Sequence, residues 1–275
     1  MTPLRHDARS ATRRHSLTVR ITHWVNVLCI IFLLPSGLQI FNAHPALYLG
    51  EISDFDNPVL AISAEPAPNA DGLRGFVTLG DVSFTTTGLL GASKGPSDTL
   101  QQRAFPSWST LPGDNNLAEG RRWHFFFAWL FVLNGAIYLI HGLASRHAFR
   151  NLAPTLTDLK RIGADIRDHL RLRFHPDNGK YGPLQKLAYF GIAFLVLPVI
   201  VVSGWAMSPG MNAAFPWMVD IFGGRQSART MHFVAAFLLV LFIVVHLAMV
   251  VLTGPLRGLR AMVTGGQTKG AANVE

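Results

Sequence analysis

The sequence predicts an all-α integral membrane protein, a bundle of four transmembrane helices with a long extracytoplasmic loop between the first and the second. Two observations predict this fold class. The 275 residues are 49% hydrophobic and only 15% charged, whereas ordinary soluble domains are about 25% charged. The apolar residues also fall into four blocks that approach the ~20 residues needed to cross a bilayer. This composition argues against a soluble globular enzyme and against a disordered chain.

The four predicted spans occupy residues 21–41, 123–143, 184–207 and 231–252. Together they define a transmembrane domain over residues 21–252, between a basic head at 1–20 and a tail at 253–275. Residues 42–120 connect the first two spans, and residues 144–183 connect the second to the third. We expect the first block to remain as a span, because Leu38-Gln39-Ile40-Phe41 at its end offers no small residues for cleavage by a signal peptidase.

Charge in the connecting segments predicts the orientation. Sixteen of the 24 Lys and Arg residues lie in the head, in loop 144–183 and in the tail. Loop 42–120 carries three basic residues against nine acidic ones. The positive-inside rule therefore predicts a protein of the bacterial inner membrane with both termini on the cytoplasmic side and loop 42–120 on the outer side. Because the basic residues flank apolar blocks, the net charge of +8 indicates membrane lipid as a partner and not nucleic acid.

The two long loops each leave alternatives open. Loop 42–120 is rich in Gly, Pro, Ser, Thr and Asp, so it is either a connector or a cap that docks an external partner. Residues 157–172 form a possible helix whose basic side chains either contact anionic lipid or reflect the ordinary positive-inside bias.

Histidines are the most informative residues within the spans. Ionisable side chains inside a membrane are costly and mark function by default, and five of the 11 histidines lie there: His23, His124, His141, His232 and His246. His232 and His246 are 14 residues apart, which puts them on one helix face with ~21 Å between them along the axis. Two planar cofactors stacked across a bilayer need this separation, whereas the ligands of a single zinc ion must converge.

Each of these two histidines has a partner expected at the same depth. His124 opens the second span level with His232, and His23 lies at the start of the first span level with His246. Imidazole is a common axial ligand of haem, so the two cross-helix pairs predict two b-type haems. The chain has no Cys-x-x-Cys-His motif, and the single cysteine excludes both a disulfide framework and a Cys-based metal site.

His141 is an alternative ligand for the inner haem. It lies 17 residues after His124, about 100° away from the same helix face. His141 could therefore pair with His246 only if the second span were rotated or kinked, for instance at Gly135.

Residues near the histidines support a cofactor site. The pattern Arg-x-x-His-Phe occurs at residues 121–125 and again at 229–233. Arg20, Arg121 and Arg229 are candidates to bind haem propionates, because guanidinium pairs with carboxylates, or they anchor the helices at the interface. Gly37, Gly135 and Gly204 would allow close approach of a backbone or a flat ring, and the Phe125–Phe127 run is expected to face lipid.

Taken with these motifs, the chain resembles the bacterial di-haem cytochrome b family. The residues that carry the resemblance are Thr22-His23-Trp24, Arg122-Trp123-His124-Phe125, and His232 with His246. The family includes cytochrome b561 proteins, the b subunits of nickel–iron hydrogenases and the gamma subunits of formate dehydrogenases. Residues 205–210 and 222–229 look like a subgroup that accompanies periplasmic molybdopterin oxidoreductases.

The resemblance implies a membrane anchor that carries electrons between a periplasmic redox enzyme, of the molybdopterin type, and the quinone pool. By motif, His124 and His232 would hold the outer haem, and His23 and His246 the inner one. Quinone or quinol would react near the inner haem, where Asn26 and Lys186 are candidate contacts.

Other readings of the sequence remain as alternatives. Within redox proteins, the chain could be the b subunit of a hydrogenase or of a formate dehydrogenase. A transporter with histidine relays is disfavoured, because the spans hold almost no Asp or Glu and the histidines lie near the two surfaces. A cofactor-free anchor would leave the 14-residue spacing unexplained. In the preferred reading the polypeptide itself makes and breaks no bonds.

Overall fold

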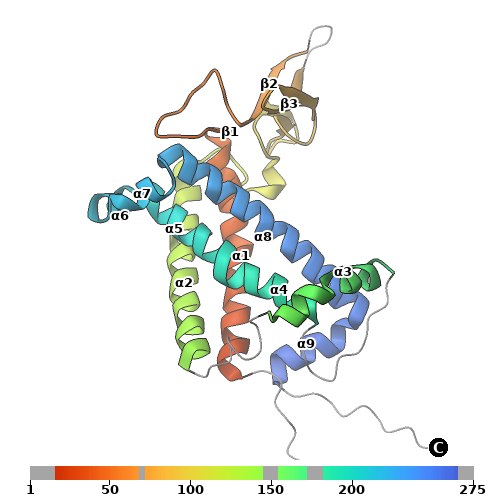
Figure 1. Cartoon of the computed structure of the whole chain (residues 1–275). Coiled ribbons are helices and arrows are strands. Elements are labelled where there is room, and N and C mark those ends of the chain that lie inside the picture. Colours follow the sequence, from red (N-terminus) through yellow and green to blue (C-terminus); the bar gives the residue numbers. More distant parts are fainter. Residues whose placement is uncertain (1–15, 68–71, 145–153, 172–181, 266–275) are drawn as a thin grey trace, which may run out of the picture. The chain divides into compact units, whose positions relative to one another are not determined.

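The computed structural model describes residues 16–67, 72–144, 154–171 and 182–265 (Figure 1). Within this described part, four helical segments are long and apolar enough to cross a membrane: Leu17–Asn42, Leu117–Ala144, Pro183–Met207 and Arg225–Thr253. The fold class predicted from the sequence, an integral membrane protein with four spanning helices, is confirmed. The helices extend beyond several of the predicted bounds, because helical hydrogen bonds continue into the polar flanks that hydropathy leaves out.

The first, second and fourth spans are single helices, whereas the third span is built from three consecutive helical pieces. α1 is Leu17–Asn42, α2 is Leu117–Ala144 and α8 is Arg225–Thr253. The third span runs through α4 (Pro183–Gly191), a π-helical turn at Ile192–Val196 and α5 (Leu197–Met207). The π turn directly precedes Pro198, which lacks a backbone N–H and whose ring would crowd the preceding turn of a regular α-helix.

The chain divides into two compact units whose boundaries fall inside the long helices. The first unit comprises Met1–Trp24, Ala136–Tyr189 and Phe242–Glu275, and the second comprises Val25–Gly135 and Phe190–Leu241. Each is described separately below.

Aromatic side chains form the helical core of the second unit. Cys29, Phe127 and Phe131 are buried between α1 and α2, and residues of α5 pack against them. Phe32 stacks on Phe127 with ring centroids 4.1 Å apart, and on Trp123 at 5.4 Å. Stacked rings of this kind fix two helices side by side.

The Phe125–Phe127 run only partly meets its prediction. Phe125 and Phe126 are exposed, as expected for side chains that face lipid. The expectation was wrong for Phe127, which is 6% exposed. Three consecutive helical residues cover 200° of the circumference, so one of them turns toward α1.

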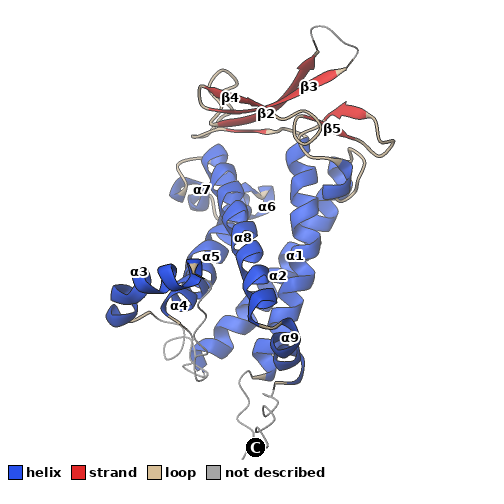
Figure 2. Cartoon of the chain, turned by 90° about the vertical axis from the view of Figure 1, so that its right-hand side faces the viewer, coloured by secondary structure: helices blue, strands red, loops and turns tan. Residues whose placement is uncertain are grey.

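The loop between α1 and α2 is folded, and in the second unit its strands lie at one end of the helices (Figure 2). The strands are β1 (Ala46–Leu47), β2 (Leu60–Pro66), β3 (Leu73–Leu79), β4 (Val82–Thr85), β5 (Ala92–Lys94) and β6 (Leu100–Gln102). β1 to β4 form an antiparallel sheet in chain order, and β5 pairs with β6. A 3₁₀ turn at Ser107–Ser109 follows, and the short helices α6 (Pro209–Ala214) and α7 (Trp217–Ile221) connect α5 to α8.

The sheet shares a hydrophobic core with the helix ends. Leu47 and Ile62 of the sheet are buried against Phe41 at the end of α1, and Phe233 of α8 packs on the same cluster. The rings of Phe41 and Phe233 lie 4.7 Å apart. The sheet therefore depends on both helices for its apolar contacts.

Arg103 organises the chain between β6 and α2. Its side chain is 3% exposed, and its guanidinium donates hydrogen bonds to the Phe105 carbonyl at 2.7 Å, the Gly113 carbonyl at 2.9 Å and the Thr110 hydroxyl at 3.0 Å. Burial lowers the pKa of Arg103 from its ordinary value, and Asp114 partly offsets that shift. A buried cation is tolerated here because its donors are paired with oxygen atoms.

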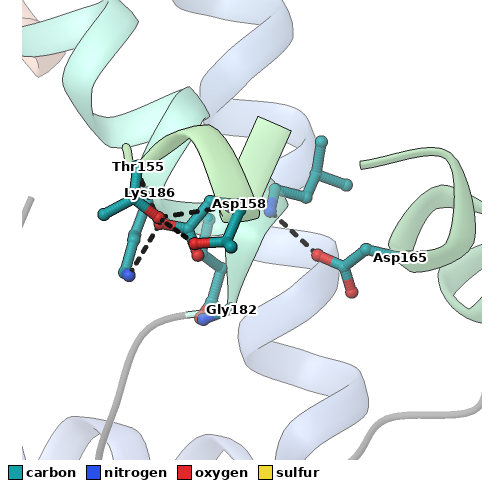
Figure 3. A network of polar contacts seen from close by, with 8 residues as sticks. Thr155, Asp158, Asp165, Gly182 and Lys186 are labelled. Carbon is teal, nitrogen blue, oxygen red and sulfur yellow. Dashed lines mark hydrogen bonds and ion pairs between the residues drawn. The ribbon is translucent and has the colours of Figure 1, made fainter. Parts of the chain in front are cut away.

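In the first unit, α3 (Leu156–Leu170) is bonded to the start of the third span (Figure 3). The helix expected at residues 157–172 is thus confirmed. Asp158 pairs with Lys186 at 3.0 Å, and Asp165 accepts a hydrogen bond from the Leu184 amide at 2.8 Å. Hydrogen bonds from the Thr155 amide and hydroxyl, with that from Lys186, lower the pKa of Asp158 to about 2. The two carboxylates bind near the N-terminal end of α4, where unpaired N–H groups favour anions.

We predict that Arg103→Ala destabilises the segment between β5 and α2 by about 3 kcal/mol, because three buried acceptors lose their donor. Amide hydrogen exchange over residues 92–113 measures this loss. Arg74→Ala is the control, since Arg74 is exposed and lies over the Phe76 ring. Equal protection in both variants would contradict the role given to Arg103.

Candidate functional site

Two of the predicted histidines face each other in the second unit. The rings of His124, on α2, and His232, on α8, have centroids 6.3 Å apart and planes inclined by 67°. A metal bonded to both rings at ~2 Å, with about 1 Å from each nitrogen to its ring centre, separates the centroids by ~6 Å. The two imidazoles are therefore spaced as a shared metal ion requires.

The Nδ1 atom of His124 is held by α1. It lies 3.1 Å from the Leu33 carbonyl oxygen and 3.2 Å from the Ser36 hydroxyl. The Ser36 hydroxyl donates its own hydrogen to the Phe32 carbonyl at 2.6 Å, so it meets His124 as an acceptor.

His232 is held in the same way by α5. Its Nδ1 atom lies 3.0 Å from the Ile200 carbonyl oxygen and 3.1 Å from the Ser203 hydroxyl. The Ser203 hydroxyl donates to the Val199 carbonyl and is left as an acceptor for the imidazole.

This network assigns the proton of each ring. Both neighbours of each Nδ1 are acceptors, so the hydrogen of the neutral imidazole belongs on Nδ1. Nε2 then keeps a free lone pair, which is the form of histidine that binds a metal.

A glycine beside each serine makes room for the ring. A Cβ atom at Gly37 would lie 3.3 Å from Cε1 of His124, and one at Gly204 would lie 3.4 Å from Cε1 of His232. Each glycine follows the accepting carbonyl by four residues, the position whose side chain would stand over that carbonyl. The missing side chain lets the imidazole reach the oxygen.

The site is therefore built twice from one pattern. Ser36-Gly37 of α1 holds the histidine of Arg-x-x-His-Phe in α2, and Ser203-Gly204 of α5 holds the one in α8. The two glycines and the repeated Arg-x-x-His-Phe pattern were predicted from the sequence as part of a cofactor site, whereas the two serines were not.

The other predicted pair lies in the first unit. His23 and His246 are close enough for their charges to interact. The Nδ1 atom of His23 is buried and has no hydrogen-bond partner in the described part of the chain. Phe242 stacks on His246 with ring centroids 5.8 Å apart.

His141, the alternative ligand, is engaged elsewhere. Its Nε2 atom lies 3.1 Å from the hydroxyl of Ser16. The residues weighed as quinone contacts also have partners, since Asn26 accepts a hydrogen bond from Asn134 at 2.7 Å and Lys186 pairs with Asp158.

The three predicted arginines lie near the histidines in sequence, and each contacts protein groups. Arg20 donates to the Met262 carbonyl at 3.3 Å and to the Val263 carbonyl, at the end of α9 (Pro255–Thr264). Arg121 is exposed and lies over the ring of Phe125. A role for either side chain at a haem propionate stays a prediction.

Arg229 belongs to a clamp between α8 and residues 44–50, which run through β1 into the β1–β2 loop. It donates to the Ala46 and His44 carbonyls, and its neighbour Thr230 donates to the Tyr48 carbonyl at 2.6 Å. Three further hydrogen bonds, all made by Gly50, complete the clamp. The Gly50 carbonyl accepts the amides of Gln226 at 2.9 Å and Ser227 at 3.2 Å, and the Gly50 amide donates to the Ser227 hydroxyl at 2.8 Å. The first turn of α8 is thus capped by a loop some 175 residues away in sequence.

The available ligands restrict the kind of metal site. Within the described ranges, no three His, Cys, Asp or Glu residues gather into a group that could hold a metal ion. Two imidazoles alone do not complete a zinc site. Imidazole is a side chain that commonly binds haem iron, so this facing pair would suit a haem.

The chain is similar along most of its length to known membrane cytochromes and redox-enzyme subunits. The family described as prokaryotic cytochrome b561 matches residues 14–265. The chain is 30% identical over 253 residues to YedZ1 of Azospira oryzae, named as an inferred subunit of a protein-methionine-sulfoxide reductase; the match covers 91% of this chain and 96% of that protein. It is 22% identical over 248 residues to a probable Ni/Fe-hydrogenase B-type cytochrome subunit of Cupriavidus necator, covering 86% and 77% of the two chains.

We predict that Gly224→Ala breaks the clamp and Gly223→Ala does not. Both glycines have positive φ, at 119° and 69°, so either alanine costs about 1 kcal/mol in backbone strain. Only at Gly224 would the new Cβ overlap backbone, because it would lie 2.4 Å from the Gly50 carbonyl group. The measurement is amide exchange at Gly50, Gln226 and Ser227, which should accelerate much more in Gly224→Ala. Similar exchange in the two variants would refute the close contact.

Proposed function

The chain belongs to the prokaryotic cytochrome b561 family, and from that premise we propose that it is the membrane-embedded cytochrome subunit of a redox enzyme complex. The family binds haem b. In our proposal this chain holds two haems and carries electrons between the quinone pool and a redox enzyme bound at the face that carries loop 42–120.

The observation that carries the proposal is the His124–His232 pair. Its 6.3 Å ring spacing, the proton held on each Nδ1 and the glycine beside each ring meet three separate requirements of a haem with two axial imidazoles. When bound, the haem iron supplies a centre that takes up and releases one electron at a time. The protein fixes the two imidazoles, excludes water and supplies the surrounding charge.

For the second haem we propose His23 and His246 as ligands. The 14-residue spacing of His232 and His246 on the unbroken helix α8 supports one site near each membrane surface. The contact of His141 with Ser16 favours His23 over His141. Arg20, Arg121 and Arg229 remain candidates for the propionates.

For the partner we propose a periplasmic molybdopterin oxidoreductase that acts on methionine sulfoxide or a related oxidised substrate. The greater identity and fuller coverage of YedZ1, a subunit named for a protein-methionine-sulfoxide reductase, favour this partner over a hydrogenase. The acidic loop 42–120 and the basic loop 144–183 support termini in the cytoplasm and an inner-membrane location. Family membership speaks against a transporter or a cofactor-free anchor.

The first test is haem stoichiometry. We predict two haems b in the purified protein, and one each in His124→Ala, His232→Ala, His23→Ala and His246→Ala. His141→Ala is the matched control and should keep both. Pyridine haemochrome absorbance against protein concentration measures the count. One haem in the unmodified chain would refute the two-site proposal, and loss of haem in His141→Ala with retention in His23→Ala would reassign the second site.

The second test concerns the serines. We predict that Ser36→Ala and Ser203→Ala each weaken retention of the same haem about tenfold, because each imidazole loses one of its two acceptors. Transfer of haem to apomyoglobin measures retention. Thr253→Ala is the control, since that hydroxyl donates to the Met249 carbonyl of the same helix. Equal haem loss from the control would show that the serines act only through helix stability.

A further inference from the structure

The loop between β1 and β2 combines exposed apolar and acidic side chains. Leu49, Ile52 and Phe55 are 65%, 79% and 74% exposed. Three exposed acids alternate with them, and we call the whole set the β1–β2 patch: Leu49, Glu51, Ile52, Asp54, Phe55 and Asp56. Large apolar side chains grouped on a surface mark contact with another molecule.

The backbone that presents this patch is fixed. Gly50 is bonded to the first turn of α8 through its amide and its carbonyl. The Asp54 carboxylate accepts the Asp56 amide at 3.2 Å and the Asn57 side chain at 3.0 Å. The ring of Phe55 lies 5.9 Å from that of Tyr48, which is buried. A surface ordered in advance loses less entropy when a partner binds.

The patch is anchored at the helix end that carries the histidine pair. The clamp to the loop uses α8 residues Gln226 to Thr230, and His232 follows two residues later. In Figure 1 the β1–β2 loop runs outward from the sheet at this end of the second unit. A protein that binds the patch therefore approaches the His124–His232 site and not the opposite end of α8.

The charge of the β1–β2 patch indicates which kind of molecule binds it. A lipid surface is a poor match, because segments that lie on membranes carry Lys and Arg on their polar face, whereas the polar residues of this patch include three carboxylates. Loop 42–120 has only three basic residues, and Arg103 among them is buried. The complementary surface is a protein with an apolar centre and a rim of Lys or Arg.

We propose that the β1–β2 patch is the docking surface for the redox partner, which presents an apolar area bordered by basic side chains. This inference rests on the proposed function, because it assumes that electrons leave or enter through the His124–His232 site.

The test uses ferricytochrome c as the probe, a small redox protein whose exposed haem edge is ringed by lysines. The dithionite-reduced protein gives up one electron, and the ferric iron of cytochrome c is reduced to ferrous by that electron. Stopped-flow absorbance of cytochrome c gives the rate of this electron transfer. We expect Glu51→Gln/Asp54→Asn/Asp56→Asn to lower the rate on the order of tenfold at low salt. The control Glu65→Gln/Asp81→Asn/Asp98→Asn removes the same charge from exposed carboxylates elsewhere in the loop and should change the rate less than twofold.

The apolar side chains of the β1–β2 patch are tested with a second pair of variants, one in the patch and one control. Leu49→Ser/Ile52→Ser/Phe55→Ser should slow the reaction. The control Leu79→Ser/Val82→Ser/Phe84→Ser alters three residues of β3 and β4 that are each more than half exposed, and it should leave the rate unchanged. Equal effects in test and control sets, for charge or for apolar residues, would overturn the proposal. Haem content and the reduced spectrum are recorded for the unmodified protein and for every variant. Absence of haem from the unmodified protein would count against the proposed function, whereas a normal spectrum with an unchanged rate in the test variants would count against the docking surface alone.

A spin label distinguishes contact of the β1–β2 patch with lipid from exposure of the patch to water. Cys29 is fully buried, so a nitroxide on Ile52→Cys reports one site in proteoliposomes. We expect collisions with the water-soluble relaxer nickel-EDDA to exceed those with oxygen. The reverse order would place the patch in the bilayer and overturn the proposal.

Discussion

The structure depends on how two imidazoles are held inside an apolar bundle. A buried N–H group needs an acceptor, yet the carbonyls of a membrane helix are already used by its own ladder. Each carbonyl has a second lone pair, and Leu33 and Ile200 offer theirs to His124 and His232. Glycine four residues later leaves each ring room at the carbonyl, since a Cβ atom there would lie 3.3 Å from Cε1 of His124 at Gly37 and 3.4 Å from Cε1 of His232 at Gly204.

Helix geometry made part of this site predictable from the sequence. The 14-residue spacing of His232 and His246 predicted a shared helix face, and equal depth at the openings of two spans predicted that His124 and His232 form a pair. The serines could not be identified in that way, because a serine in a membrane helix commonly bonds to its own backbone, as Ser36 also does. Its second contact is made with another helix. A search for Ser-Gly in the first and third spans, paired with Arg-x-x-His-Phe in the next span, would have found it.

The sheet was missed for a different reason. Strands such as β2 and β3 bury few of their own side chains, so loop 42–120 reads as polar and irregular. Its core is completed by Phe41 at the end of α1 and by Phe233 of α8. A segment whose apolar partners lie on distant helices carries only a weak local signal, and the span predictions gave no reason to look for those partners.

The clamp between Gly50 and α8 ties the loop to the helix end that carries His232. The first N–H groups of a helix need acceptors, and at α8 the Gly50 carbonyl supplies one for Gln226 and Ser227. Arg229 and Thr230 extend the same contact to within two residues of His232. Folding of the β1–β2 loop and placement of the imidazole are therefore coupled through one turn of helix. Removal of the loop would leave the helix end uncapped at the residues that position the ligand.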